Sequence, residues 1–326
     1  MGSLRGRRPA MSPSGATERA SAMFLLSSLP HGAKARLRAI YAAARLRLVR
    51  AFRSYGPDEL MRCVRALGLR DGDSALLHSS FGAQFGFTGS IEDLTDVFLD
   101  AVGPTGHLLM VSLPYRTSSL EYLRNLKQFD VRRTPSMMGL VSEYFRRRPD
   151  VVRSLHPTHP ILVHGPDAEA IVAAHPGCLY PCGPGTPFDR LLALDGMVLF
   201  FNVEFAVFTF FHYLEHRVSA DLPFRLYTDE PIAVPVVDRH GNRGTVTTYV
   251  YSREAIQRRR FPVLEAELRR RGAIRSRRIG NGMVEAIRVR DAIECVDDMR
   301  RQGRYFYDLS GLPNPANRPV ALGKAT

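Results

Sequence analysis

The chain has 326 residues, of which 45% are apolar and 24% charged, and its net charge of +13 gives a pI near 10. This length is enough to bury one large core, or one core with a small appendage. The composition is that of a soluble globular protein. No apolar run approaches the roughly 18–20 residues that a membrane-spanning helix needs, and the short apolar patch behind the first arginines predicts no secretory signal.

The basic excess favours a partner that carries phosphate, such as nucleic acid, anionic lipid or a phosphorylated cofactor. A solvated arginine-rich surface explains the same charge. No nucleic-acid-binding module is recognisable and aromatic residues do not interleave with the basic runs, so nucleic acid is not the predicted partner. The basic runs are Arg5–Arg8, Lys34–Arg53, Arg146–Arg148 and Arg258–Arg278.

The four cysteines are scattered, without a CxxC pair. Cys178 and Cys182 could supply two metal ligands, but no second Cys/His pair follows at zinc-finger spacing. We therefore expect no metal, and a reducing cytoplasm as the location that suits these cysteines best.

At the N-terminus, residues 1–20 are rich in Ser, Gly, Pro and Arg without periodicity, and we expect them to be disordered. Residues 21–55 form the next predicted segment. Within it, apolar residues recur at helical spacing between arginines over Ala33–Phe52, which predicts a basic amphipathic helix. Such a helix usually packs on a domain and sometimes lies on a membrane surface, so peripheral membrane contact stays open.

The next part of the chain predicts a strand–loop–helix–strand unit. A helix over Pro57–Leu67 comes first, followed by a buried strand at Ala75–His78 and a loop bearing three glycines. Ser90 then caps a helix at Ile91–Val102, with Asp93 completing a capping box. A second buried strand at His107–Leu113 makes this a right-handed βαβ crossover, whose loop could hold phosphate.

Further elements follow from periodicity and from Gly and Pro breaks. Beyond residue 220 the sequence changes to a hairpin around His240–Gly244, followed by charged helices. The predicted helices are Met137–Arg147, Asp167–Ala174, Phe188–Leu194, Thr209–Val218, Arg253–Arg271 and Asp291–Gln302, and the predicted strands are Ile161–Val163, Met197–Val203, Ile232–Asp238, Thr245–Tyr251 and Met283–Val289.

Five histidines are grouped within 61 residues, a stretch that also holds His164: His156, His159, His175, His212 and His216. Because imidazole titrates near neutrality, such clustering indicates acid–base chemistry or metal binding. The alternative is a set of hydrogen-bonded core and turn histidines. A metal-dependent hydrolase is disfavoured because no carboxylates follow at ligand spacing.

At these residues the chain resembles the aminoglycoside 3-N-acetyltransferase family. Order and spacing of the matching motifs hold over roughly residues 56–218, about half the chain. The motifs are Leu77–Ser80, Val102–Gly106, Phe129–Asp130, Thr134–Gly139, Phe145–Arg146, Arg153–Ser154 with His156–Pro157, His164–Pro166, Gly183–Pro187 and His212–Glu215.

The resemblance implies an α/β fold, a three-layer α/β/α sandwich with a small antiparallel β subdomain. Residues 56–218 would be the acetyl-CoA-binding core and residues 219–326 the acceptor side. It also implies acetyl-CoA as cosubstrate and direct transfer of the acetyl group to an amine, without a covalent enzyme intermediate or a metal. The implied coenzyme A contacts are Ser79, Ser80, Thr134, Ser136, Arg153 and Ser154, and the implied active-site histidine is His212.

Physical chemistry supports these catalytic roles. Direct transfer needs a base for the proton of the amine, and a histidine three residues before a carboxylate shares one helix face with it. Glu215 could therefore raise the basicity of His212 and fix its tautomer. His156 is a further catalytic candidate or a turn-stabilising imidazole between prolines, and Asp130 is a ligand or an Asx-turn residue.

The acceptor side departs from the family pattern. Phe205, Phe208 and Phe210 stand where small polar residues are usual, which predicts an apolar rim, and Glu254 is the only acidic candidate after the hairpin. We therefore expect a small-molecule amine acceptor, an amino sugar on a neutral or anionic body. An aminoglycoside-resistance enzyme and a non-catalytic coenzyme A-binding member are the alternatives, and a homodimer stays open.

Overall fold

The computed structural model describes residues 31–312, which fall into two compact units, residues 31–52 and residues 53–312. The first unit is one helix, α2 (His31–Phe52), where the sequence predicts a helix over Ala33–Phe52. The tail predicted to be disordered, residues 1–20, lies outside the described residues. The second unit contains both sheets.

A seven-stranded sheet forms the centre of this unit, in the order β4-β5-β2-β1-β6-β10-β9. The three central strands β2, β1 and β6 are parallel, so their carboxyl ends meet at one edge of the sheet. Strands β5 and β10 flank them in antiparallel orientation. The strands are β1 (Ser74–Ser79), β2 (His107–Val111), β4 (Val152–Arg153), β5 (Ile161–His164), β6 (Met197–Phe201), β9 (Arg275–Ile279) and β10 (Gly282–Arg288).

The predicted βαβ unit is present. Helix α4 (Ile91–Val102) connects the parallel strands β1 and β2. Its first turn is closed by the predicted capping box: the Asp93 amide donates to Ser90 Oγ at 3.0 Å, and the Ser90 amide donates to Asp93 Oδ2 at 2.7 Å. Gly103 ends the helix with a φ of 69°, which a residue with a side chain rarely adopts.

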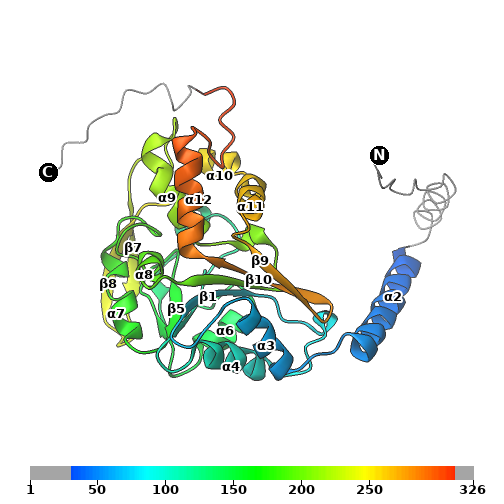
Figure 1. Cartoon of the computed structure of the whole chain (residues 1–326). Coiled ribbons are helices and arrows are strands. Elements are labelled where there is room, and N and C mark those ends of the chain that lie inside the picture. The colour runs from blue at the N-terminus through cyan, green and yellow to red at the C-terminus, as the bar shows by residue number, and fades with distance from the viewer. Residues whose placement is uncertain (1–30, 313–326) are drawn as a thin grey trace, which may run out of the picture. The chain divides into compact units, whose positions relative to one another are not determined.

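Helices cover both faces of the sheet (Figure 1). Because side chains alternate along a strand, Leu76 joins the core under one layer of helices, whereas Ala75 and Leu77 join the core under the other. The predicted three-layer α/β/α sandwich is thus confirmed. One layer holds α3 (Pro57–Ala66), α4 and α6 (Leu140–Arg146); the other holds α7 (Ala168–Val172), α8 (Pro187–Ala193), α9 (Phe211–Val218), α11 (Phe261–Arg270) and α12 (Val289–Arg301).

A second, three-stranded sheet consists of β3 (Phe129–Asp130), β7 (Ile232–Val237) and β8 (Arg243–Thr248). Strands β7 and β8 form the predicted antiparallel hairpin. Asp238 Oδ1 accepts from the amides of His240 and Asn242 and so fixes the turn. Strand β3 adds to β7 in parallel, so the small sheet is mixed rather than purely antiparallel.

After residue 219, one predicted helix is interrupted in the structure. The single helix predicted over Arg253–Arg271 is two helices, α10 (Arg253–Arg258) and α11, because Pro262 lacks the amide proton that a continuous helix requires. Arg259 lies at this break. The sequence also gave no sign of α5 (Ser119–Asn125), β3, β4 or β9. Strands β9 and β10 join the main sheet, so residues 219–312 contribute to both sheets.

Candidate active site

His212 and Glu215 form the centre of the site on helix α9. His212 Nδ1 lies 2.7 Å from Glu215 Oε2, and the Glu215 side chain is completely buried whereas that of His212 is 16% exposed. Because a carboxylate only accepts, Nδ1 must carry the hydrogen and donate it. The Nε2 atom of neutral His212 is then left with a lone pair, as a general base requires.

Two residues from distant parts of the chain hold the Glu215 carboxylate. Arg259 donates from Nε to Oε1 at 2.6 Å and from Nη2 to Oε2 at 2.9 Å, and the Tyr307 hydroxyl also donates to Oε1. Burial alone would raise the pKa of Glu215, but the charge of Arg259 and the His212 hydrogen bond hold this pKa below its usual value. Glu215 is therefore a buried anion.

The same surroundings set the charge state of His212. Burial lowers its pKa, and the opposing hydrogen bond to Glu215 offsets this only in part. The imidazole is consequently neutral at pH 7 and able to accept a proton. Its ring lies 4.8 Å from the ring of Tyr251, over which the Arg259 guanidinium stacks at 4.6 Å.

The other clustered histidines surround this centre but are enclosed. The His159 ring meets the His212 ring edge-on at 5.4 Å. His156 is fully buried, stacks on His175 at 4.3 Å, and accepts the His159 amide on Nδ1 at 3.1 Å. That is the turn-stabilising geometry, and the catalytic role of His156 stays a prediction. His216 pairs instead with the Tyr227 hydroxyl, at 2.9 Å.

Ser79 lies where the parallel strands end. It lines a cavity of about 100 Å³ between polar groups of His78, Ser142 and Thr209 and apolar side chains. Ser80 follows, and its amide donates to the Phe201 carbonyl at 2.9 Å. The apolar residues that line the cavity are Leu77, Met110, Val111, Met138, Val203 and Val207.

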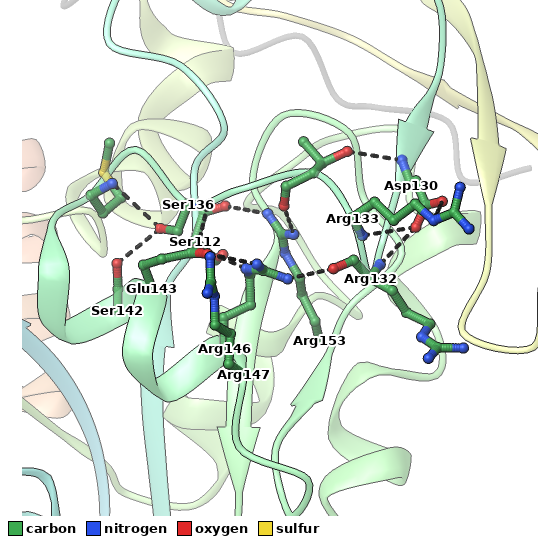
Figure 2. Close-up of polar contacts among 12 residues, drawn as sticks. Ser112, Asp130, Arg132, Arg133, Ser136, Ser142, Glu143, Arg146, Arg147 and Arg153 are labelled. Carbon is green, nitrogen blue, oxygen red and sulfur yellow. Dashed lines mark hydrogen bonds and ion pairs between the residues drawn. The ribbon is translucent and has the colours of Figure 1, made fainter. Parts of the chain in front are cut away.

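The segment that holds Thr134 and Ser136 is fixed by its own hydrogen bonds (Figure 2). Asp130 Oδ1 accepts from the amides of Arg132 and Arg133, so Asp130 has the Asx-turn role. Thr134 Oγ1 in turn accepts the Asp130 amide at 3.0 Å. Ser136 Oγ pairs with the hydroxyl of Ser142, a residue of the cavity at Ser79, at 2.8 Å.

Arg153 joins three stretches of backbone at this edge. Its guanidinium donates to the carbonyl of Ser112 at 2.8 Å (Figure 2) and to those of Thr134 at 2.5 Å and Val131 at 3.2 Å. It also lies over the Phe129 ring. Burial, with the nearby charge of Arg146, lowers the pKa of Arg153 to about 9. No carboxylate of the described residues is hydrogen-bonded to it.

Ser154 differs from the other predicted cofactor contacts because its side chain is fully buried. Its hydroxyl accepts the Ile161 amide and pairs with His175 Nδ1, both at 2.9 Å. Ser154 therefore stabilises the turn that contains His156 and His159. Its predicted contact with the cofactor stays a prediction.

A strongly basic cleft of about 560 Å³ lies beside Arg153. Glu143 pairs with Arg146 and Arg147, and Asp150 with Arg148, so part of this charge is compensated. The charged and imidazole side chains that line it are Arg132, Arg146, Arg147, Arg148, Arg153, Arg239 and His240.

Another cavity, of about 460 Å³, lies on the side of Tyr251. Tyr251 is thus shared, because it contacts the His212 ring and also lines this cavity. The remaining lining residues come from the start and body of α5 and from α10: Ser118, Leu120, Glu121, Arg124, Arg253, Ile256 and Gln257.

Comparisons with known proteins identify this arrangement. Residues 76–300, more than half of the chain, match the family described as Aminoglycoside 3-N-acetyltransferase. The chain belongs to this family. The resemblance found in the sequence is confirmed, and the protein is an N-acetyltransferase with acetyl-CoA as its cosubstrate.

Individual relatives share the fold and much of the length. Aminoglycoside N(3)-acetyltransferase VII of Streptomyces paromomycinus is 32% identical over 205 residues, 56% of this chain and 68% of the relative. The crystal structure of aminoglycoside acetyltransferase AAC(3)-Xa superposes with a TM-score of 0.65 at 26% identity, covering 76% of this chain and 93% of that one. The apoenzyme of AAC(3)-IVa gives 0.63 at 25% identity, covering 81% and 96%.

In this member of the family, two expectations for the acceptor side are wrong. Phe205, Phe208 and Phe210 do not form a rim, because the short 3₁₀ turn Phe205–Val207 presses all three rings into the core beside β6. Glu254 does not line the cavity at Tyr251 and pairs with Arg258 at 2.8 Å. Apolar character alone could not distinguish a core position from a rim.

Arg259, Tyr307 and Tyr251 are the site residues that sequence reasoning missed. Arg259 and Tyr307 lie 44 and 92 residues after Glu215. The Pro262 break was the one available signal, since it places Arg259 outside a helix. Within residues 31–312, no group of three or more His, Cys, Asp or Glu side chains is placed to hold a metal, and none of the helices is long and apolar enough to cross a membrane.

Proposed function

We propose that the enzyme transfers the acetyl group of acetyl-CoA to the primary amine of an amino sugar, with His212 as general base and Glu215 as its positioning partner. The observation that carries this proposal is the hydrogen-bonded chain from His212 through Glu215 to Arg259 and Tyr307 beside a cavity. A non-catalytic member would have no need of a buried anion that holds one histidine tautomer.

The chemistry follows from this arrangement. The neutral amine attacks the thioester carbonyl, a C–N bond forms, and His212 Nε2 takes the proton released from nitrogen. The C–S bond then breaks, and the proton passes from the imidazolium to the departing thiolate. Glu215 stabilises the transient positive charge of His212, while Arg259 keeps the carboxylate ionised.

We further propose that coenzyme A binds along the carboxyl edge of the sheet. The cavity at Ser79, which has both apolar and polar lining, suits the pantetheine arm, with Ser79, Ser80 and Ser136 as hydrogen-bonding groups. The basic cleft beside Arg153 suits the phosphates. Thr134 lies in sequence between Arg132, which lines the basic cleft, and Met138, which lines the cavity at Ser79. Arg153 donates a hydrogen bond to the Thr134 carbonyl.

The acceptor in this proposal is neutral or anionic rather than a polycation. The cavity at Tyr251 contains two arginines and one glutamate, whereas a polycation requires carboxylates. Aminoglycoside acetylation is the second candidate, favoured by the names of the relatives. The free cysteines, Cys63, Cys178, Cys182 and Cys295, fit a cytoplasmic location.

The test measures thiol release from acetyl-CoA with a panel of amines, and mass spectrometry of the products. We expect acetylated amino sugars from the wild type and none from His212→Ala. If kanamycin or gentamicin is acetylated more efficiently than every neutral or anionic amine, the second candidate is correct.

A further inference from the structure

The cavity at Tyr251 contains arginines that lack the acidic partners found elsewhere. Arg124 and Arg253 make no hydrogen bond or ion pair with a side chain within residues 31–312. Their neighbours in sequence differ: Arg258, Arg259 and Arg260 each pair with a carboxylate. Two exposed guanidinium groups without a side-chain partner therefore remain at a cavity whose lining includes Tyr251, the residue that contacts the His212 ring.

The other residues that line the cavity do not neutralise the positive charge of Arg124 and Arg253. Among residues 31–312, Glu121 is the only acidic residue that lines it, and neither arginine bonds to the Glu121 carboxylate. The other lining residues are neutral. With two positive charges against one negative charge, the cavity attracts anions and disfavours polycations.

We infer that this cavity binds an oxyanion of the acceptor, a phosphate or a carboxylate, through Arg124 and Arg253. This inference rests on the proposed function, because it assigns the acceptor to the side of Tyr251. The two guanidinium groups come from different elements, the last turn of α5 and the first residue of α10, and so can approach one group from two directions. Planar guanidinium groups suit this geometry because each can donate two parallel hydrogen bonds.

The position of Tyr251 links this anion site to catalysis. Tyr251 is among the residues that line the cavity although it is almost fully buried, and its ring lies 4.8 Å from the His212 ring. An acceptor whose anionic group is held at the arginines therefore has its body against Tyr251 and its amine near the base. Anion binding would orient the amine, so its loss affects kcat/KM for anionic acceptors and leaves neutral acceptors unchanged.

The experiment compares glucosamine, glucosamine 6-phosphate, 2-amino-2-deoxyglucuronic acid and kanamycin. Both kcat/KM and calorimetric affinity in the presence of coenzyme A are measured. The wild type should prefer the phosphate or the carboxylate to glucosamine, and the preferred one identifies the oxyanion. Arg124→Gln and Arg253→Gln should each lower kcat/KM and affinity for it by about tenfold, the usual effect of a lost charge-assisted hydrogen bond.

Matched variants separate this effect from general damage. Arg243→Gln removes an exposed arginine of β8 that does not line the cavity, and should leave kcat/KM unchanged for both neutral and anionic acceptors. Glu121→Gln removes the opposing charge and should strengthen anion binding. The KM for acetyl-CoA should stay constant in all four variants, because the basic cleft beside Arg153 is a different cavity.

The outcomes distinguish the two proposals. Equal kcat/KM for glucosamine and its anionic analogues, or equal losses on both in the Arg124 and Arg253 variants, overturns the anion site and leaves the proposed function intact. Absence of any His212-dependent acetylation overturns the proposed function. In that case, calorimetry still decides the anion site: arginine-dependent binding of the phosphate or carboxylate analogue supports it, and lack of such binding refutes it.

Discussion

A single imidazole nitrogen, Nε2 of His212, has the central chemical role in the proposed transfer. Replacing His212 by Ala should lower kcat by about 10²–10⁴-fold, the usual contribution of general acid–base catalysis. The affinity for coenzyme A should change little, because neither the cavity at Ser79 nor the basic cleft is lined by His212. Steady-state kinetics measures the effect on kcat, and calorimetry measures the affinity for coenzyme A. Full turnover in this variant would transfer the role to another base.

The pH dependence of kcat/KM reports the state of this base. Because the pKa of His212 is lowered below its ordinary value of 6.5, the ascending limb should lie below pH 6.5, and activity is lost as pH falls through it. Glu215→Gln removes an interaction that raises the pKa of His212. The ascending limb should then move to still lower pH, because the pKa of His212 is lower. The kcat should also fall, because His212 is a weaker base and its tautomer is no longer fixed.

The titration of the amine itself provides an internal control, since its limb at higher pH should be the same in both proteins. An ascending limb that keeps its position in Glu215→Gln would show that His212 is not the group being observed. His159, whose ring meets that of His212, is then the next residue to examine.

The buried ion pair between Glu215 and Arg259 also contributes to stability. Arg259→Gln leaves a buried carboxylate without its counter-charge, and should lower the free energy of unfolding by about 3–5 kcal/mol. Since the folded-state pKa of Glu215 is depressed, the pair stabilises above the unfolded value near 4.5, and its effect disappears as pH falls through the folded value. Chemical denaturation at pH 7 and at pH 4 should therefore show a smaller difference between variant and wild type at the lower pH. Tyr307→Phe keeps both charges and should cost less.

At the scale of elements, helix α4 has the clearest local stability signal. Ser90→Ala removes the hydroxyl that accepts the Asp93 amide and half of the reciprocal cap. We expect a loss of about 1 kcal/mol in the free energy of unfolding, as is typical of an N-cap. Ser90→Gly should lower the free energy of unfolding by only a few tenths of a kcal/mol. A loss as large as that in Ser90→Ala would argue against a capping role.

Elements with strong local signals were predictable and elements held by tertiary pairing were not. Helix α4 and the β7–β8 hairpin have caps, turn residues and periodicity within their own sequence. Strand β9 has the sequence Arg-Ser-Arg-Arg-Ile, mostly exposed and without an apolar alternation, so only its pairing with β10 makes it a strand. Strands β3 and β4 are two residues long, too short for any period to be visible.

The candidate site divides in the same way. His212 and Glu215 lie one helical turn apart, so a short motif contains both and the sequence could indicate their pairing. Arg259 and Tyr307 reach the same carboxylate from 44 and 92 residues away, and only the fold brings them there. Phe208 shows the converse limit, because its apolar character was read correctly and its location was not.

Over the whole second unit, most of the basic excess after residue 255 is used in ion pairs. Glu267 alone contacts Arg270, Arg271 and Arg304. A net charge therefore says little about any particular surface, and what sets Arg124 and Arg253 apart is that both line the cavity at Tyr251. In 0.5 M salt, an anionic acceptor should lose more kcat/KM than glucosamine does, since screening acts over only a few ångströms at that concentration.

The contact of Tyr307 with Glu215 has a consequence for the time at which the site becomes complete. Residues 306–308 run beside Arg259: the Arg260 amide donates to the Phe306 carbonyl and the Asp308 amide to the Arg258 carbonyl, at 2.9 and 2.8 Å. During synthesis, His212, Glu215 and Arg259 all emerge from the ribosome before residues 306–308 do. A nascent or truncated chain that lacks residues 305–308 would have His212 and Glu215 without the hydrogen bond from Tyr307, so competence for transfer begins only after these residues have been made.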